Sequence, residues 1–173
     1  MINNINTDAV LRFIDDVQKD PAKAKKTKRV EGEWTLVKGQ PQFRARVEYP
    51  SGADTLEADT APFMGGTGIK PDPVQYCLFG LAACYASTFA AIAAGEGVVL
   101  AKLVVAAENL VDLSRSIGVS SNPIVEGVTI TATVQSEAET GKLEEIERLT
   151  RERCPGVYCL TNPIPLTTKL VRG

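Results

Sequence analysis

The chain has 173 residues, of which 44% are hydrophobic and 23% are charged, as expected for a single soluble domain. Its formal net charge of −2 gives no electrostatic basis for binding nucleic acid, so we expect no such partner. The sequence contains no histidine, which removes the commonest general base and the commonest metal ligand. Any chemistry must therefore use cysteine, arginine, lysine, tyrosine or carboxylate side chains.

The N-terminal stretch MINNINTDAVLRFIDDVQKDP lacks a basic start followed by a long apolar run. We therefore expect no signal peptide and a cytoplasmic location, where thiols are normally reduced. The four cysteines are then more typical of catalytic, redox-active or buried thiols than of a disulfide framework. Their spacings do not form the paired Cys-x-x-Cys motifs of a structural zinc site, so we expect no metal and no cofactor.

The first part of the chain is predicted to be a helix followed by a linker. Apolar residues recur at helical spacing as far as Pro21 and predict an amphipathic helix over residues 7–20. The sequence AKAKKTKR follows, and we interpret this short basic run as a solvated linker. We separate this N-terminal helix and basic linker, residues 1–27, from a main domain over residues 28–173.

Three strands are predicted next, over residues 29–37, 42–50 and 52–59. In the second of them apolar and polar residues alternate from Gln42 to Tyr49, which suits a sheet with one face in water. Glycine and proline residues between the three segments supply the turns. A glycine-rich loop then leads towards the centre of the chain, but it has neither dinucleotide-binding nor P-loop spacing.

The strongest secondary-structure signal is a central helix. Asp72 can cap it, Pro73 suits its first position, and Gln75 completes a capping box. No charged residue occurs from Tyr76 to Ala94, a run long enough to be tested as a membrane span. Seven of its nineteen residues are alanine, so its hydrophobicity is weak for a span. We expect a helix that is buried on all sides, and no membrane partner.

The remaining elements are predicted to be two long strands, a helix and a last strand. The strands at 98–113 and 123–138 are rich in β-branched residues and are expected to form an antiparallel pair. An amphipathic helix follows at 140–153, with its Glu and Arg residues facing outward, and an alternating segment at 164–171 predicts the last strand. Strands and helices are segregated along the chain, which indicates the α+β class.

Two cysteine motifs then combine into a family resemblance. DPVQYCLFGLAACYAS and the later RERCPGVYCL resemble the motifs of the OsmC/Ohr family of osmotically inducible and organic-hydroperoxide-resistance proteins. The order of predicted elements also resembles that family over residues 28–172. The resemblance implies an OsmC-like fold in which antiparallel sheets surround a long buried central helix, and an intertwined homodimer. It also implies oxidative-stress defence through reduction of organic hydroperoxides, with an external dithiol as reductant.

The resemblance also implies roles for individual residues. By motif position Cys84 corresponds to the peroxidatic cysteine, and Cys154 corresponds to the resolving cysteine. Active members of the family carry a glutamate two residues after the residue that opens the central helix, where this chain has Val74. That glutamate helps to hold an arginine, which lowers the thiol pKa. The candidates for such a supporting cation in this chain are Arg44 and Arg46.

Three interpretations of the function follow. The first is a thiol-dependent peroxidase that uses Cys84 and Cys154. The second is a catalytically degenerate OsmC-fold protein that binds a small apolar ligand, which Val74 favours. The third is a purely structural role, for which only the N-terminal helix speaks. Free cysteine is also common as inert filler in apolar interiors, the interpretation we give to Cys77 and Cys159, which have no counterpart in the motifs.

Overall fold

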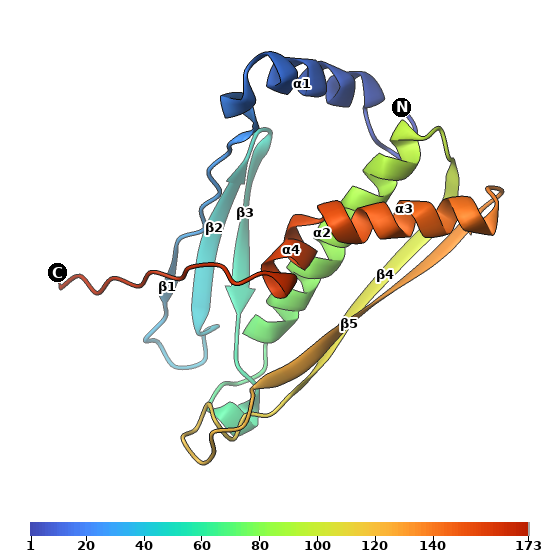
Figure 1. The fold of residues 1–173 in the computed structure, drawn as a ribbon. Helices are drawn as coiled ribbons and strands as arrows, with labels where there is room; N and C mark the ends of the chain where they lie inside the picture. The colour runs from blue at the N-terminus through green and yellow to red at the C-terminus, as the bar shows by residue number, and fades with distance from the viewer. Residues whose placement is uncertain (173) are drawn as a thin grey trace. The chain divides into compact units, whose positions relative to one another are not determined.

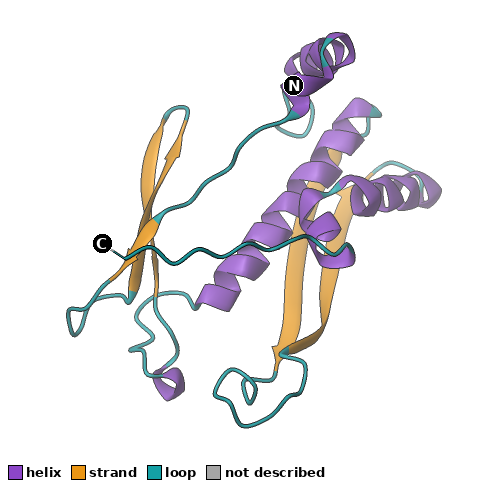
Figure 2. Ribbon diagram, turned by 60° about the vertical axis from the view of Figure 1, so that its left-hand side comes forward, coloured by secondary structure: helices purple, strands orange, loops and turns teal. Residues whose placement is uncertain are grey.

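The computed structural model describes residues 1–172, and over these residues it has four α-helices and five strands in two antiparallel sheets (Figure 1). The chain divides into two compact units. One unit combines residues 1–7 with the chain from residue 80 onward, and the other contains residues 8–79. Sheets and helices are segregated along the chain (Figure 2), so the predicted α+β class is confirmed.

The sheet of the unit of residues 8–79 has three strands in the order β1-β2-β3. Strands β1 (Gly32–Trp34), β2 (Phe43–Tyr49) and β3 (Gly52–Ala58) pair antiparallel, and all three lie within the predicted segments. The register places Arg44 of β2 directly opposite Glu57 of β3. Opposite charges at facing positions stabilise such a pair of strands.

Helix α1 (Thr7–Lys19) confirms the helix predicted at residues 7–20, and none of its residues is buried. Its apolar face remains in solvent in this chain, with Leu11 63% exposed. Two short 3-10 turns also occur, η1 (Pro21–Ala24) and η2 (Pro62–Met64). The boundary proposed between residues 27 and 28 stays a prediction.

A buried carboxylate organises the loop that precedes the central helix. Asp59 is only 2% exposed, and its Oδ2 accepts hydrogen bonds from the backbone N–H and hydroxyl of Thr67 and from the backbone N–H of Ile69. A Cβ on Gly66 would lie 1.9 Å from the backbone oxygen of Thr60, so the loop has no room for a side chain there. Gly66 therefore serves close chain packing, whereas Gly65 has open space around it and a φ of 87°, a conformation that favours glycine.

Helix α2 (Pro73–Gly95) begins as the sequence predicts. The Oδ1 of Asp72 accepts a hydrogen bond from the backbone N–H of Val74 at 2.8 Å. The Oε1 of Gln75 accepts one from the backbone N–H of Asp72 at 2.9 Å, which completes the capping box. Gly97, with a φ of 72°, follows the end of the helix in the left-handed conformation typical of glycine there.

The burial of α2 differs from the expectation. In this chain the buried residues form one row along the helix, together with one neighbouring alanine: Leu81, Tyr85, Phe89, Ala93 and Ala94. Phe79 is 71% exposed, so the chain alone does not bury the helix on all sides. An 18-residue window of α2 has a mean hydropathy of 1.8, and by length and composition the helix is able to cross a membrane. Core helices of soluble proteins pass the same test.

The unit that begins at residue 80 packs its part of α2 and two further helices against a long two-stranded sheet. Strands β4 (Leu100–Val111) and β5 (Val125–Ser136) pair antiparallel, as predicted. Helix α3 (Thr140–Arg153) matches the predicted helix, and helix α4 (Pro155–Thr161) follows it directly. The core gathers buried residues from α2, α3, α4 and the segments beside them: Tyr85, Phe89, Ala93, Val98, Ile146, Cys154 and Val157.

One prediction for the C-terminal region was wrong, and one helix there was not predicted. The segment at 164–171 forms no strand, because no strand within residues 1–172 pairs with it, and Leu166 and Leu170 are 88% and 100% exposed. An alternating pattern forms a strand only where a neighbour completes its hydrogen bonds. The sequence analysis also missed α4, although Pro155 occupies the first position of this helix, where proline is favoured.

Candidate functional site

The two motif cysteines lie against each other in the unit that begins at residue 80. The Cys154 side chain lies close enough to Cys84 to raise its pKa, and Cys84 packs against the buried cluster that contains Cys154. Gly156 also contacts this pair: a Cβ built on it would lie 3.4 Å from the Cys84 Cβ and 3.7 Å from the Cys154 Sγ. The fold thus brings together two thiols that are far apart in the sequence.

Each cysteine is positioned by a helix, and the two differ in exposure. Cys84 lies in the middle of α2, immediately before the buried Tyr85, and is partly exposed. Cys154 joins α3 to α4, is 0% exposed, and donates its backbone N–H to the oxygen of Thr150 at 2.8 Å. A molecule arriving from solvent therefore reaches Cys84 before Cys154.

The surroundings of Cys84 favour its neutral thiol. Burial is the largest effect and raises the pKa of Cys84, because a charged sulfur loses hydration there. The backbone N–H of Gly156 acts in the opposite direction, since a hydrogen bond to the thiolate lowers the pKa. The Cys154 thiol raises the pKa of Cys84 again, and the net direction is upward. Fast thiolate chemistry at neutral pH therefore needs a further stabilising group.

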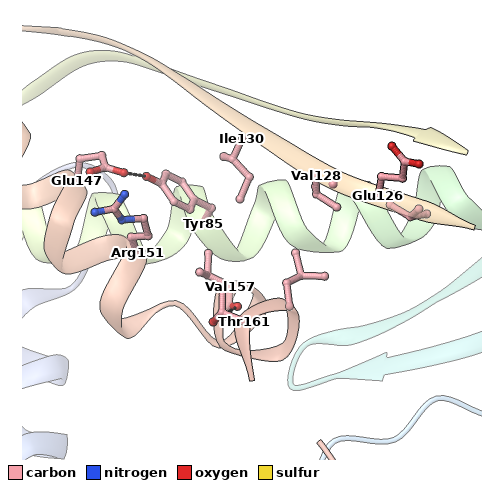
Figure 3. Close-up of a pocket in the computed structure, with 11 residues that line it drawn as sticks. Tyr85, Glu126, Val128, Ile130, Glu147, Arg151, Val157 and Thr161 are labelled. Atoms are coloured by element: carbon pink, nitrogen blue, oxygen red, sulfur yellow. Dashed lines mark hydrogen bonds between the residues drawn. The ribbon is translucent and has the colours of Figure 1, made fainter. Parts of the chain in front are cut away.

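A polar cluster beside the cysteines received no role in the sequence analysis. The buried Tyr85 donates its hydroxyl to the Oε1 of Glu147 at 3.1 Å, and Arg151 lies at the same end of a pocket (Figure 3). Burial, followed by the charge of Glu147, raises the pKa of Tyr85 to about 12, and Cys154 contributes in the same direction. Glu147 and Arg151 are one helical turn apart on α3, and this spacing is the feature of the sequence that could have indicated that they lie side by side.

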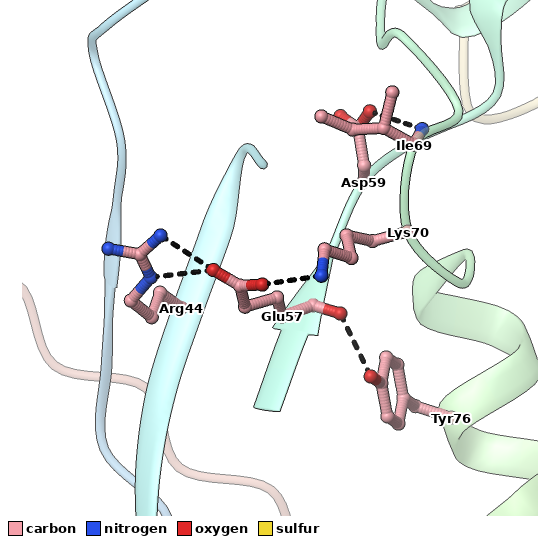
Figure 4. A network of polar contacts seen from close by, with 6 residues as sticks. All are labelled: Arg44, Glu57, Asp59, Ile69, Lys70 and Tyr76. Carbon is pink, nitrogen blue, oxygen red and sulfur yellow. Dashed lines mark hydrogen bonds and ion pairs between the residues drawn. The ribbon is translucent and has the colours of Figure 1, made fainter. Parts of the chain in front are cut away.

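Arg44 belongs to a polar network in the unit of residues 8–79 (Figure 4). Its Nη2 and Nε lie 2.6 Å and 2.8 Å from the Oε1 of Glu57, whose Oε2 is 2.7 Å from the Lys70 ammonium. The Tyr76 hydroxyl donates to the backbone oxygen of Glu57 at 2.8 Å. Lys70 first, and then Arg44, lower the pKa of Glu57, so this carboxylate remains charged and holds both cations.

Arg46, the other candidate cation, is held much less firmly. Its Nε is 3.7 Å from the Oε1 of Glu48, and the two side chains are 71% and 79% exposed. An exposed pair of this kind contributes little to stability and leaves the guanidinium mobile. Both candidate arginines belong to residues 8–79 and Cys84 to the other unit, so the structure assigns neither of them to the thiol.

The remaining two cysteines are not buried filler. Cys77 and Cys159 are both exposed in this chain, because they lie on uncovered faces of α2 and α4. Cys159 lies near enough to Cys84 to contribute to its raised pKa. Among residues 1–172 no three histidine, cysteine or acidic side chains gather in a way that would hold a metal ion.

Comparisons with known proteins match both the sequence and the fold. The family model described as "OsmC-like protein" matches residues 66–169. A structure of an organic hydroperoxide resistance protein OsmC from Legionella pneumophila is 19% identical, with a TM-score of 0.57, and covers 79% of this chain and 92% of its own. No curated protein sequence matches the chain.

Two further structures show the same likeness in fold. An OsmC-like protein from Mycoplasma pneumoniae is 18% identical, with a TM-score of 0.53 and coverage of 78% of this chain and 89% of its own. A protein from Psychrobacter arcticus, described as a putative osmotic stress induced and detoxification response protein, is 16% identical with a TM-score of 0.58. It covers 77% of this chain and 88% of its own. At these identities the likeness establishes the fold.

Proposed function

Because this chain belongs to the OsmC-like protein family, we propose that it is a thiol-dependent peroxidase that reduces organic hydroperoxides with Cys84 and Cys154. The observation that carries the proposal is the contact between a partly exposed cysteine on α2 and a fully buried cysteine before α4. A protein of similar fold from Legionella pneumophila is named an organic hydroperoxide resistance protein, which agrees with a role in oxidative-stress defence.

The proposed reaction uses two cysteines in turn. The Cys84 thiolate attacks the terminal oxygen of the hydroperoxide, the O–O bond breaks, and the alkoxide leaves and takes up a proton to become an alcohol. Cys84 then carries a sulfenic acid. The Cys154 sulfur attacks the Cys84 sulfur, an S–S bond forms, and the hydroxyl departs as water. An external dithiol reduces this disulfide by thiol–disulfide exchange and returns both thiols.

Of the two candidate cations we propose Arg44 rather than Arg46, because of how firmly each guanidinium is held within residues 8–79. Val74 stands where the family has the glutamate that holds an arginine, so another carboxylate must hold it here. Glu57 binds Arg44 through two nitrogens of one guanidinium, whereas Arg46 has only a loose contact with Glu48. A guanidinium held in one orientation is the better partner for an anionic sulfur.

We further propose that the protein is a cytoplasmic homodimer. The chain alone leaves large apolar side chains of α2 in solvent, including Phe79 at 71% exposure, and a second copy would cover them. Packing of this kind, rather than insertion into a membrane, is our interpretation of the hydrophobic helix. Light scattering at low micromolar concentration should give about twice the chain mass of 18.5 kDa, and a stable monomer would contradict the proposal.

The peroxidase activity is tested by following cumene hydroperoxide in the presence of a dithiol. We expect Cys84→Ser to abolish consumption, and Cys154→Ser assayed without the dithiol to consume one equivalent and stop at the sulfenic acid. Cys77→Ser is the matched control, because Cys77 is an exposed thiol on the same helix, and it should consume peroxide like the unmodified protein. Undiminished turnover in Cys84→Ser would refute the assignment.

A second candidate function is the binding of a small apolar ligand. Within residues 8–79 a pocket of about 540 Å³ is lined mainly by apolar side chains, including Trp34, Phe43 and Phe79. Apolar walls of this kind suit a hydrophobic ligand without any thiol chemistry. If no peroxide is consumed at any pH while an apolar dye binds at one saturable site and Trp34→Ala weakens it, this candidate replaces the peroxidase.

A further inference from the structure

A second pocket lies in the unit that begins at residue 80, between β5 and α4 and alongside α2 (Figure 3). Its volume is about 610 Å³, within the range of roughly 300–1,000 Å³ typical of small-molecule sites. Neither Cys84 nor Cys154 lines it, although Tyr85 at one of its ends directly follows Cys84. The pocket is therefore a different place from the sulfur pair and needs its own explanation.

One end of the pocket is charged, and its two charges balance. Arg148 is ion-paired with Glu152 at 3.2 Å, whereas the side chain of Arg151 makes no ion pair or hydrogen bond among residues 1–172. Glu147 has one oxygen occupied by the Tyr85 hydroxyl at 3.1 Å. This end thus offers free donors on Arg151 and a remaining acceptor oxygen on Glu147, with a net charge near zero.

The rest of the pocket is mostly apolar. Val128 and Ile130 of β5 lie on one side, and Val157 of α4 lies on the other (Figure 3). The remaining charged group, Glu126, lies at the opposite end from Arg151 (Figure 3). An elongated apolar body can therefore lie along the walls while its head reaches the charged end.

We propose that this pocket binds an alkyl chain that ends in a neutral hydroxyl head, with the head oxygen accepting from Arg151 and its O–H donating to Glu147. A hydroxyl is both a donor and an acceptor, so it satisfies both groups at once. A carboxylate head would be attracted by Arg151 but repelled by Glu147. An ammonium head would be attracted by Glu147 but repelled by Arg151. Either charged head therefore meets one opposite and one like charge and gains no net electrostatic attraction at this end.

The ligand class has a chemical connection to the proposed reaction, whose organic product is an alcohol. The proposal does not depend on that reaction, because binding requires no thiol. It is tested with reduced protein and no peroxide, so its failure is distinguishable from failure of the peroxidase proposal. Decanol, decanoate and decylamine serve as probes with one chain length and three head groups.

Calorimetric titration of the full chain should show saturable binding of decanol that is tighter than binding of decanoate or decylamine. Arg151→Leu should weaken decanol about tenfold, the loss expected for one hydrogen bond to a charged group. Arg148→Leu is the matched control, because Arg148 lies on the same helix as Arg151 but pairs with Glu152 and does not line the pocket. It should leave the affinity unchanged.

The charge balance is tested separately with Glu147→Gln. This variant keeps a hydrogen-bonding side chain and removes the negative charge, so decanoate should gain affinity and approach decanol. Circular dichroism should show that all three variants remain folded. Tighter binding of decanoate than of decanol to the unmodified protein, equal losses in Arg151→Leu and Arg148→Leu, or no saturable binding of decanol would each overturn the proposal.

Discussion

Gly156→Ala is a small change made directly at the proposed reaction centre. Gly156 is the second residue of α4, and its backbone N–H faces the Cys84 thiol. The new methyl group would lie 3.0 Å from the Leu81 Cδ1, 3.4 Å from the Cys84 Cβ and 3.7 Å from the Cys154 Sγ. Of these contacts only the one with Leu81 is too short, and that atom is the tip of a flexible side chain.

The structural cost should be small and the chemical cost larger. Overpacking in an interior costs about 1–3 kcal/mol, and alanine regains up to about 1 kcal/mol over glycine in a helix. We therefore expect the free energy of unfolding to fall by about 0–2 kcal/mol. Formation of a disulfide requires the two sulfurs to approach to about 2 Å, and the methyl group fills space between their side chains. A misplacement approaching 1 Å should slow this step by about ten- to a hundredfold.

The assay is the loss of free thiols after one equivalent of cumene hydroperoxide, with dimedone used to trap sulfenic acid. In Gly156→Ala the sulfenic acid on Cys84 should persist and the disulfide should form slowly. Gly141→Ala is the matched control: Gly141 is the second residue of α3, and a Cβ there meets no atom within 4 Å. Equal rates of disulfide formation in the two variants would refute the steric argument.

Three further predictions concern charge. Since burial raises the pKa of Cys84, peroxide consumption should increase about tenfold per pH unit above neutrality. A fast rate that is flat from pH 6 to 8 would contradict this. In steady-state kinetics at pH 7, Arg44→Gln should lower the rate of peroxide consumption about tenfold or more, while Arg46→Gln leaves it nearly unchanged. A larger loss in Arg46→Gln than in Arg44→Gln would exclude Arg44 as the supporting cation. The pKa of Tyr85 rises from 10.0 to about 12 on folding, so the stability that this shift contributes is present below pH 10. The free energy of unfolding should fall by about 2–3 kcal/mol as the pH passes 12. Urea titrations of Tyr85→Phe should not show this fall.

The sequence was sufficient to predict the elements whose signals are local. The capping box at Asp72 and Gln75 specified the start of α2, and alternation specified the strand that became β2. The contact of Cys84 with Cys154 is different in kind, since it was anticipated only through a family resemblance. No local pattern encodes a contact between residues that far apart.

Features that depend on neighbours in space were missed or mistaken. The segment at 164–171 has the alternation of a strand, but a strand also needs a partner, and alternation carries no information about one. Burial of α2 on all sides was inferred from composition, yet composition does not say which surface covers a helix. Arg151 and Glu147 looked like solvent-facing charges, because only the fold brings Tyr85 beside them.

The most direct test of the central claim is to map the disulfide formed when the reduced protein meets one equivalent of an organic hydroperoxide. Mass spectrometry of the digested protein should find a bond between Cys84 and Cys154, with Cys77 and Cys159 still free. Cys159 is the informative competitor, since it is exposed and acts electrostatically on Cys84. A bond from Cys84 to Cys159, or Cys84 recovered as an unmodified thiol, would contradict the proposed pair.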